Sequence, residues 1–159
     1  MALLEVRNLS LSIGGFPILR DVDLSVEAGE VLGVIGESGS GKSMTALSIM
    51  QLLPVGSAVK GSIRLEGREV LGLPDREMRA IRGQAVGMVF QEPMTALNPV
   101  KTIGDQVAET AMVHGGLGRR EALEVARQTL ERVELPTARF PLDRYPHELS
   151  GGQRQRVVI

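Results

Sequence analysis

The sequence predicts an α/β fold with an antiparallel β subdomain at its N-terminus and a helical subdomain after it. Three observations support this prediction. Apolar and polar residues alternate through much of 4–27, which is the period of half-buried strands. A continuous apolar run at 31–35 leads into a glycine-rich turn and then into a helical pattern. The strand patterns end near residue 91, and helical spacing follows them.

The predicted strands fall into two classes. Alternating segments should cover one face of a sheet; they are an edge strand at 4–7 and 9–13, and strands at 24–27 and 62–66. Gly14 and Gly15 form the turn after the edge strand. Continuous apolar runs, which are typical of strands buried on both faces, occur at 31–35 and 86–90.

Three helices are predicted from spacing and breakers. The first begins at Lys42 and continues until Pro54 stops it. A short charged helix covers 75–82. The third covers 119–133, where apolar residues recur every three or four positions, so one face should pack on a core.

Composition excludes several classes of protein. A length of 159 residues suits one domain with a real core, and the net charge of −1 offers no basic surface for nucleic acid. The chain has no cysteine, which excludes disulfides and thiolate metal sites. Glu5 and Arg7 stand where a signal peptide would be apolar, and no apolar run in the sequence is long enough to span a membrane. We therefore expect a soluble, cytosolic chain that binds no nucleic acid.

A phosphate-binding loop is predicted directly after the apolar run at 31–35. Its spacing of glycine, four residues, glycine, lysine and serine lets several backbone amides converge on phosphates at a helix N-terminus. The lysine would reach the β- and γ-phosphates, and the last serine would bind Mg²⁺. Without a ligand, the pattern would be a glycine-rich turn between strand and helix. The residues are Gly36, Glu37, Ser38, Gly39, Ser40, Gly41, Lys42 and Ser43.

A second glycine-rich motif lies near the C-terminal end and precedes a stretch compatible with a helix. Its hydroxyl and glycine amides could hold another phosphate, although a serine with two glycines is by itself also typical of a flexible linker. The residues are Leu149, Ser150, Gly151, Gly152 and Gln153.

The two motifs, in this order, resemble those of the ATP-binding subunits of ABC transporters, and the resemblance covers the whole chain. It implies a P-loop NTPase core in which two such domains pair head to tail as a homo- or heterodimer. ATP would lie between the Lys42 loop of one domain and the Ser150 motif, the signature, of the other. The resemblance divides the chain into a β subdomain and P-loop core at 1–90 and a helical subdomain with the signature at 91–159.

Gln91 stands at the end of the second apolar run, where this family has its Q-loop glutamine. The resemblance implies two roles for it: contact with Mg²⁺ or the attacking water, and communication with the transmembrane permease subunits. A polar residue at a strand end is otherwise unremarkable. Pro93 and Pro99 bracket a turn after it, which predicts a stiff loop suited to docking a partner.

The segments 90–99 and 145–157 are similar to the importers of dipeptides and oligopeptides within this family. The resemblance implies an ATP-binding subunit on the cytoplasmic face of the cell membrane. That subunit would couple ATP hydrolysis to the uptake of peptides, nickel, glutathione or other small solutes. The family stacks an aromatic ring on adenine before the phosphate loop. Here Ile13 matches that position, and Phe16 follows three residues later.

The family's Mg²⁺-binding aspartate, its catalytic glutamate and its switch histidine come after the signature motif and have no counterpart among these 159 residues. We therefore expect this chain to bind nucleotide at most and not to hydrolyse ATP by itself at a useful rate. Three alternatives stay open: a soluble ABC-type ATPase, a non-functional partial gene product, and one half of a fused double cassette.

Overall fold

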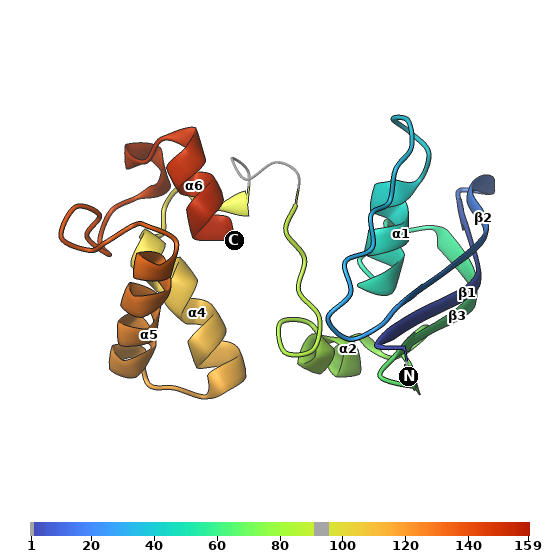
Figure 1. The fold of residues 1–159 in the computed structure, drawn as a ribbon, viewed down its shortest axis with the longest axis horizontal. Coiled ribbons are helices and arrows are strands. Elements are labelled where there is room, and N and C mark those ends of the chain that lie inside the picture. The colour runs from blue at the N-terminus through green and yellow to red at the C-terminus, as the bar shows by residue number, and fades with distance from the viewer. Residues whose placement is uncertain (1, 91–95) are drawn as a thin grey trace. The chain divides into compact units, whose positions relative to one another are not determined.

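The computed structural model describes residues 2–90 and 96–159. The chain separates into two compact units, Met1–Arg82 and Gly83–Ile159, and each is described by itself below (Figure 1). Among the described residues, every helix is too short or too polar to cross a bilayer.

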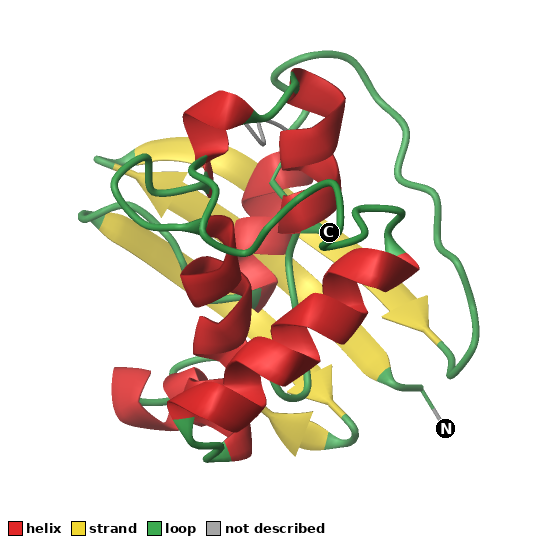
Figure 2. Cartoon of the chain, turned by 90° about the vertical axis from the view of Figure 1, so that its left-hand side faces the viewer, coloured by secondary structure: helices red, strands yellow, loops and turns green. Residues whose placement is uncertain are grey.

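The first unit is built on a four-stranded antiparallel sheet, drawn in yellow in Figure 2. Its strands are β1 (Leu4–Ile13), β2 (Phe16–Val26), β3 (Ser57–Leu65) and β4 (Arg68–Glu69), in the order β2-β1-β3-β4. The predicted strands at 4–7, 9–13 and 62–66 are confirmed within β1 and β3, and 24–27 overlaps only the end of β2, while β4 was not predicted. The prediction of β1 as an edge strand is wrong, since it pairs with both β2 and β3. Alternation reports which face of a strand is buried, and it carries no information about which backbone edge is paired.

A bulge explains why the alternation of β1 breaks at its middle. Asn8 has a φ of 48°, and the pairing with β3 shifts register between Arg7 and Ser10. Opposite the bulge, Gly61 has a φ of 113°, and a Cβ there would lie 2.6 Å from the carbonyl oxygen of Arg7. The bulge therefore keeps Val6 and Leu9, which are both fully buried, on the same face.

Two helices accompany the sheet in the first unit. Helix α1 (Lys42–Ile49) begins where predicted but ends before Pro54, because Met50 caps it and Gln51 turns the chain away with a φ of 49°. Helix α2 (Asp75–Ile81) confirms the predicted short helix and buries Met78 and Ile81.

The two apolar runs predicted as buried strands are not strands. In the first unit, residues 31–35 form no regular secondary structure, with Val31 94% and Ile35 97% exposed. In the second unit, Val86 makes an isolated bridge and the rest of 86–90 is unpaired, with Val89 and Phe90 exposed. A strand buried on both faces needs neighbouring strands and covering layers, and within each unit the described residues supply neither for these runs.

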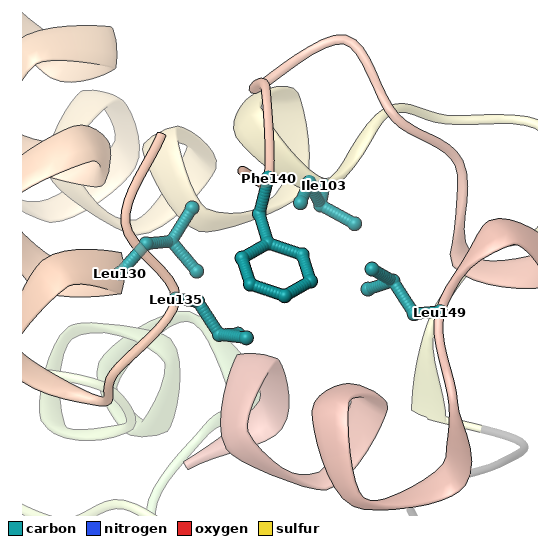
Figure 3. Close-up of a cluster of buried hydrophobic side chains, with 5 residues drawn as sticks. All are labelled: Ile103, Leu130, Leu135, Phe140 and Leu149. Atoms are coloured by element: carbon teal, nitrogen blue, oxygen red, sulfur yellow. The ribbon is translucent and has the colours of Figure 1, made fainter. Parts of the chain in front are cut away.

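The second unit is helical. It contains α4 (Ile103–Gly115), α5 (Arg119–Arg132), the short 3₁₀ helix η1 (Pro146–Glu148) and α6 (Gly151–Val158). The predicted amphipathic helix is confirmed as α5, one residue shorter at its end. In its core the ring of Phe140 lies among aliphatic side chains from four other positions, as Figure 3 shows. They are Ile103, Leu130, Leu135 and Leu149.

The loop before η1 covers the N-terminus of α4. The amide of Ile103 donates to the carbonyl oxygen of Arg144 at 2.8 Å, and the amide of Gly104 donates to that of Leu142 at 2.9 Å. Thr102 caps the next amide, that of Asp105, with its side chain. The first amides of α4 thus find acceptors in the loop, and the loop is held against the helix.

Candidate nucleotide-binding site

The predicted phosphate loop connects the segment 31–35 to the N-terminus of α1. Gly39 and Gly41 have φ values of 83° and 92°, a region that side chains rarely adopt, and Gly41 is the N-cap of α1. These glycines let the backbone curl so that the first amides of α1, which have no partners within the helix, lie at the loop. The loop can therefore offer several amides, together with the positive end of the helix dipole, to an anion.

The side chain of Lys42 folds back into the loop. Its Nζ donates to the carbonyl oxygens of Gly36 at 2.6 Å and Glu37 at 2.8 Å, and it lies 3.3 Å from Oγ of Ser40. These bonds place the ammonium group among the loop residues rather than in open solvent. It is the one side chain of the loop that brings a positive charge to a ligand held there.

Two glycines of the loop have little space for a side chain. A Cβ on Gly36 would lie 2.7 Å from Oγ of Ser40. A Cβ on Gly41 would overlap Cδ2 of Leu19, a buried residue of β2. Leu19 therefore seats the start of α1 against the sheet, a role that the sequence analysis did not identify.

Ser43, the proposed Mg²⁺ ligand, lies in the first turn of α1 and is exposed. Across residues 2–90 and 96–159, no three acidic or histidine side chains are grouped so that they could hold a metal ion. The role of Ser43 as a Mg²⁺ ligand stays a prediction.

Ile13 and Phe16 flank the turn between β1 and β2 and pair with each other across it. Phe16 is 75% exposed, whereas Ile13 is half-buried. Phe16 stands three residues before Leu19, the side chain that packs against the N-cap of α1. An exposed ring on the strand that seats the phosphate loop is available for stacking, and the adenine-binding role of both residues stays a prediction.

The signature motif forms the start of α6. Ser150 is the N-cap: its Oγ accepts from the amide of Gln153 at 3.3 Å, and the side chain of Gln153 accepts from the amide of Ser150 at 2.8 Å. This reciprocal capping box makes the motif an ordered helix start and not a flexible linker. Leu149 anchors it by being buried in the core, while Gly151 and Gly152 are exposed, and a Cβ on Gly152 would meet nothing within 4 Å.

Two arginines after the motif fasten α6 to its surroundings, and the sequence analysis missed both. Nε of Arg154 donates to the carbonyl oxygen of Leu149 at 3.0 Å. Nη1 of Arg156 lies 3.3 Å from the carbonyl oxygens of Val133 and Glu134, at the C-terminal end of α5. For Arg156 the signal in the sequence is a cation on one helix opposite the end of another, and it becomes readable only once the two helices are known to meet.

Gln91 and Pro93 lie outside the described residues. Pro99 belongs to the described segment that follows them, which α4 holds in place. The side chain of Gln106 accepts from the amide of Asn98 at 2.7 Å and donates to the carbonyl oxygens of Asn98 at 3.1 Å and Lys101 at 3.0 Å. The end of the predicted docking loop is therefore tied to a helix.

The structure thus brings the residues 36–43 together as one loop in the first unit and orders 149–153 as one helix start in the second. A groove of about 770 Å³ lies wholly within the second unit and includes Asn98, Gln106 and Val157 in its walls.

Comparison with known proteins agrees with these features. The sequence model of the family described as "ABC transporter" matches residues 19–159. The oligopeptide transport ATP-binding protein OppD of Salmonella typhimurium is 44% identical over 161 residues, covering 99% of this chain and 48% of that protein. A putative peptide import ATP-binding protein of Brucella abortus is 54% identical over 148 residues, covering 89% of this chain and 44% of that protein.

A solved structure shows the same fold. The ATP-binding cassette MJ0796, described as a dimeric post-hydrolysis state bound to ADP and Pi, matches with a TM-score of 0.82 at 28% identity, over 98% of this chain and 66% of that one. The chain spans about half the length of the curated relatives it matches. The α/β fold with its glycine-rich turn at 36–41 and helix start at Ser150, the family match and these relatives agree, and the chain belongs to the ABC transporter family of ATP-binding domains.

Proposed function

We propose that this chain is part of the ATP-binding subunit of an importer that couples ATP binding and hydrolysis to the uptake of peptides or related small solutes. The observation that carries the proposal is the phosphate loop, in which Lys42 and the glycines at 39 and 41 surround the N-terminus of α1. The kind of solute is supported by the relatives, which are named as oligopeptide or peptide import proteins.

The residues of the loop would divide the work of holding ATP. Backbone amides at the start of α1 would donate hydrogen bonds to the phosphate oxygens. The ammonium group of Lys42 would neutralise charge on the β- and γ-phosphates. Ser43 would place its hydroxyl on Mg²⁺, with Gln91 as the second protein ligand. Phe16 and Ile13 would contact the base. Bound ATP supplies the phosphoryl group whose transfer to water releases the energy for transport.

The signature residues would act on a second subunit. The start of α6 is capped by Ser150, and the space around Gly152 is open. A phosphate group bound to another subunit could therefore reach this helix N-terminus. We propose that it completes the ATP site of a partner cassette. The related cassette MJ0796, whose structure is described as dimeric, supports pairing of this kind.

We further propose that the loop around Gln91 transmits the state of the nucleotide to transmembrane permease subunits. The subunit would then lie on the cytoplasmic face of the membrane. The tie between Gln106 and Asn98 supports this, because a loop held by a helix can pass on force. We keep the division into a nucleotide core at 1–90 and a helical subdomain at 91–159 as part of this proposal.

The test is binding of a fluorescent ATP analogue to the purified chain, with and without Mg²⁺. Lys42→Ala removes a charged donor and should weaken binding roughly tenfold or more. Lys60→Ala is the matched control, since Lys60 is an exposed lysine of β3 in the same unit. Equal affinity of the Lys42→Ala variant and the unaltered chain would refute the proposed site.

A further inference from the structure

The side chain of Arg82 is bound to the C-terminal end of α1, although it lies far along the chain. Its Nε donates to the carbonyl oxygen of Met50 at 2.8 Å, and its Nη2 donates to that of Gln51 at 3.0 Å. The remaining nitrogen, Nη1, donates to Oδ1 of Asp75 at 2.9 Å. The side chain is only 19% exposed, so three nitrogens of one guanidinium group are committed at a largely buried position.

The end of α1 needs such a donor. The helix has no basic residue in its last turn, and the chain leaves it through Met50 as C-cap and Gln51 in a left-handed conformation. The last carbonyl groups of a helix have no partner within it, and they carry the negative end of the helix dipole. A buried guanidinium group satisfies both the hydrogen bonding and the charge.

The opposite end of the same helix is the phosphate loop. With eight residues, α1 is about 12 Å long. The carbonyl groups that Arg82 binds and the N-cap Gly41 therefore lie at opposite ends of one short helix. Holding the C-terminal end of α1 in place fixes the direction in which the amides at its N-terminal end point.

We propose that Arg82 is a positioning residue for the phosphate loop: it anchors the C-terminal end of α1 so that the N-terminal amides are aimed at a bound triphosphate. This inference rests on the proposed binding of ATP and adds to it a residue that touches no nucleotide. Asp75 supports the arrangement by holding Nη1 of Arg82 from α2.

The structure offers a matched control. Arg79 also donates to Asp75, through its Nε at 2.9 Å, but its side chain is 73% exposed, and within the described part of the chain its ion-pair partner is that carboxylate. Arg79→Gln therefore removes one bond to Asp75 and leaves the end of α1 intact. Arg82→Gln removes the bonds to Asp75 and to both carbonyl oxygens.

The experiment measures the affinity of the full chain for a fluorescent ATP analogue and, by competition, for inorganic tripolyphosphate. It is carried out below the unfolding temperature of every variant. Arg82→Gln should weaken binding of both ligands by the same factor, roughly three- to tenfold, because the triphosphate is the shared part. Arg79→Gln should bind both as the unaltered chain does. Arg82→Lys keeps the charge but loses the forked geometry, and it should lie between the two.

Each outcome decides the matter. A folded Arg82→Gln variant that melts earlier but binds with unaltered affinity would show that Arg82 is merely structural and would overturn the inference. If that variant does not fold, Arg82→Lys decides: weakened binding supports the inference and unaltered binding overturns it. The proposed function is refuted if the unaltered chain binds neither ligand, or if Lys42→Ala binds as tightly as the unaltered chain. The inference about Arg82 is then refuted as well. Failure of Arg82 alone leaves the effect of Lys42→Ala intact.

Discussion

Replacing Gly41 by alanine tests how the phosphate loop is built against the sheet. The residue is the N-cap of α1 with a φ of 92°, and its Cα faces Leu19, which is 5% exposed. Two separate costs are expected. A side chain in the left-handed region costs about 1–2 kcal/mol. The new methyl group also overlaps Cδ2 of Leu19, and overpacking of this kind costs about 1–3 kcal/mol.

The free energy of unfolding of the first unit should therefore fall by about 2–5 kcal/mol in Gly41→Ala. Gly39→Ala is the matched control, since Gly39 has a φ of 83° but a Cβ there would meet nothing within 4 Å. It should show only the backbone cost, about 1–2 kcal/mol. The difference between the two variants measures the contact between α1 and β2.

The assay is urea unfolding followed by far-ultraviolet circular dichroism, because the chain has no tryptophan for fluorescence. Hydrogen exchange of the α1 amides assigns the transition to the first unit. If Gly41→Ala destabilises the protein no more than Gly39→Ala, the packing of the loop against Leu19 is refuted. If neither variant is destabilised, the left-handed geometry of the loop is refuted as well.

Three further predictions concern the helical unit. The hydrogen bonds from Arg127 and then Gln128 lower the pKa of Glu124 to about 2, below its value of about 4.3 in an unfolded chain. The resulting stabilisation of α5 should be present above pH 4.3 and be lost as the pH falls toward 2. An acid titration of helicity should show this loss in the unaltered chain and not in Glu124→Gln. Gly104→Ala places a Cβ 2.6 Å from that of Leu142 and should lower the melting temperature, at a cost of about 1–3 kcal/mol, whereas alanine in an open helix would stabilise. Ser150→Ala removes the cap of α6 and should cost about 1 kcal/mol, seen as faster hydrogen exchange of the first amides of that helix.

Some local structure could be predicted because it depends on residues close together in the sequence. The positive φ values at Gly39 and Gly41 and the helix starting at Lys42 follow from a glycine pattern next to a helical one. The capping box at Ser150 requires only a serine and a glutamine three residues apart. Helix α5 follows from its own apolar spacing. Helix α4 was missed, although Thr102 before it and Gly116 after it are ordinary helix boundary signals.

Other features depend on what a segment meets in space. The apolar runs at 31–35 and 86–90 have the composition of buried strands, yet neither forms a strand, since burial is a property of a strand together with its neighbours. Strand β1 lies between β2 and β3 although its alternation suggests an edge strand, because the pairing of backbone edges leaves no pattern in the side chains.

The sequence by itself determined the family, the glycine-rich turn before α1, the helix start at Ser150 and most helix positions, because each is encoded by residue types at short spacing. Only the tertiary structure decided the sheet order, the seat of Gly41 on Leu19 and the bond of Arg82 to the end of α1. These contacts join residues that are distant along the chain, and their existence depends on packing and on backbone groups, which are chemically the same in nearly every residue and so leave no mark in the sequence.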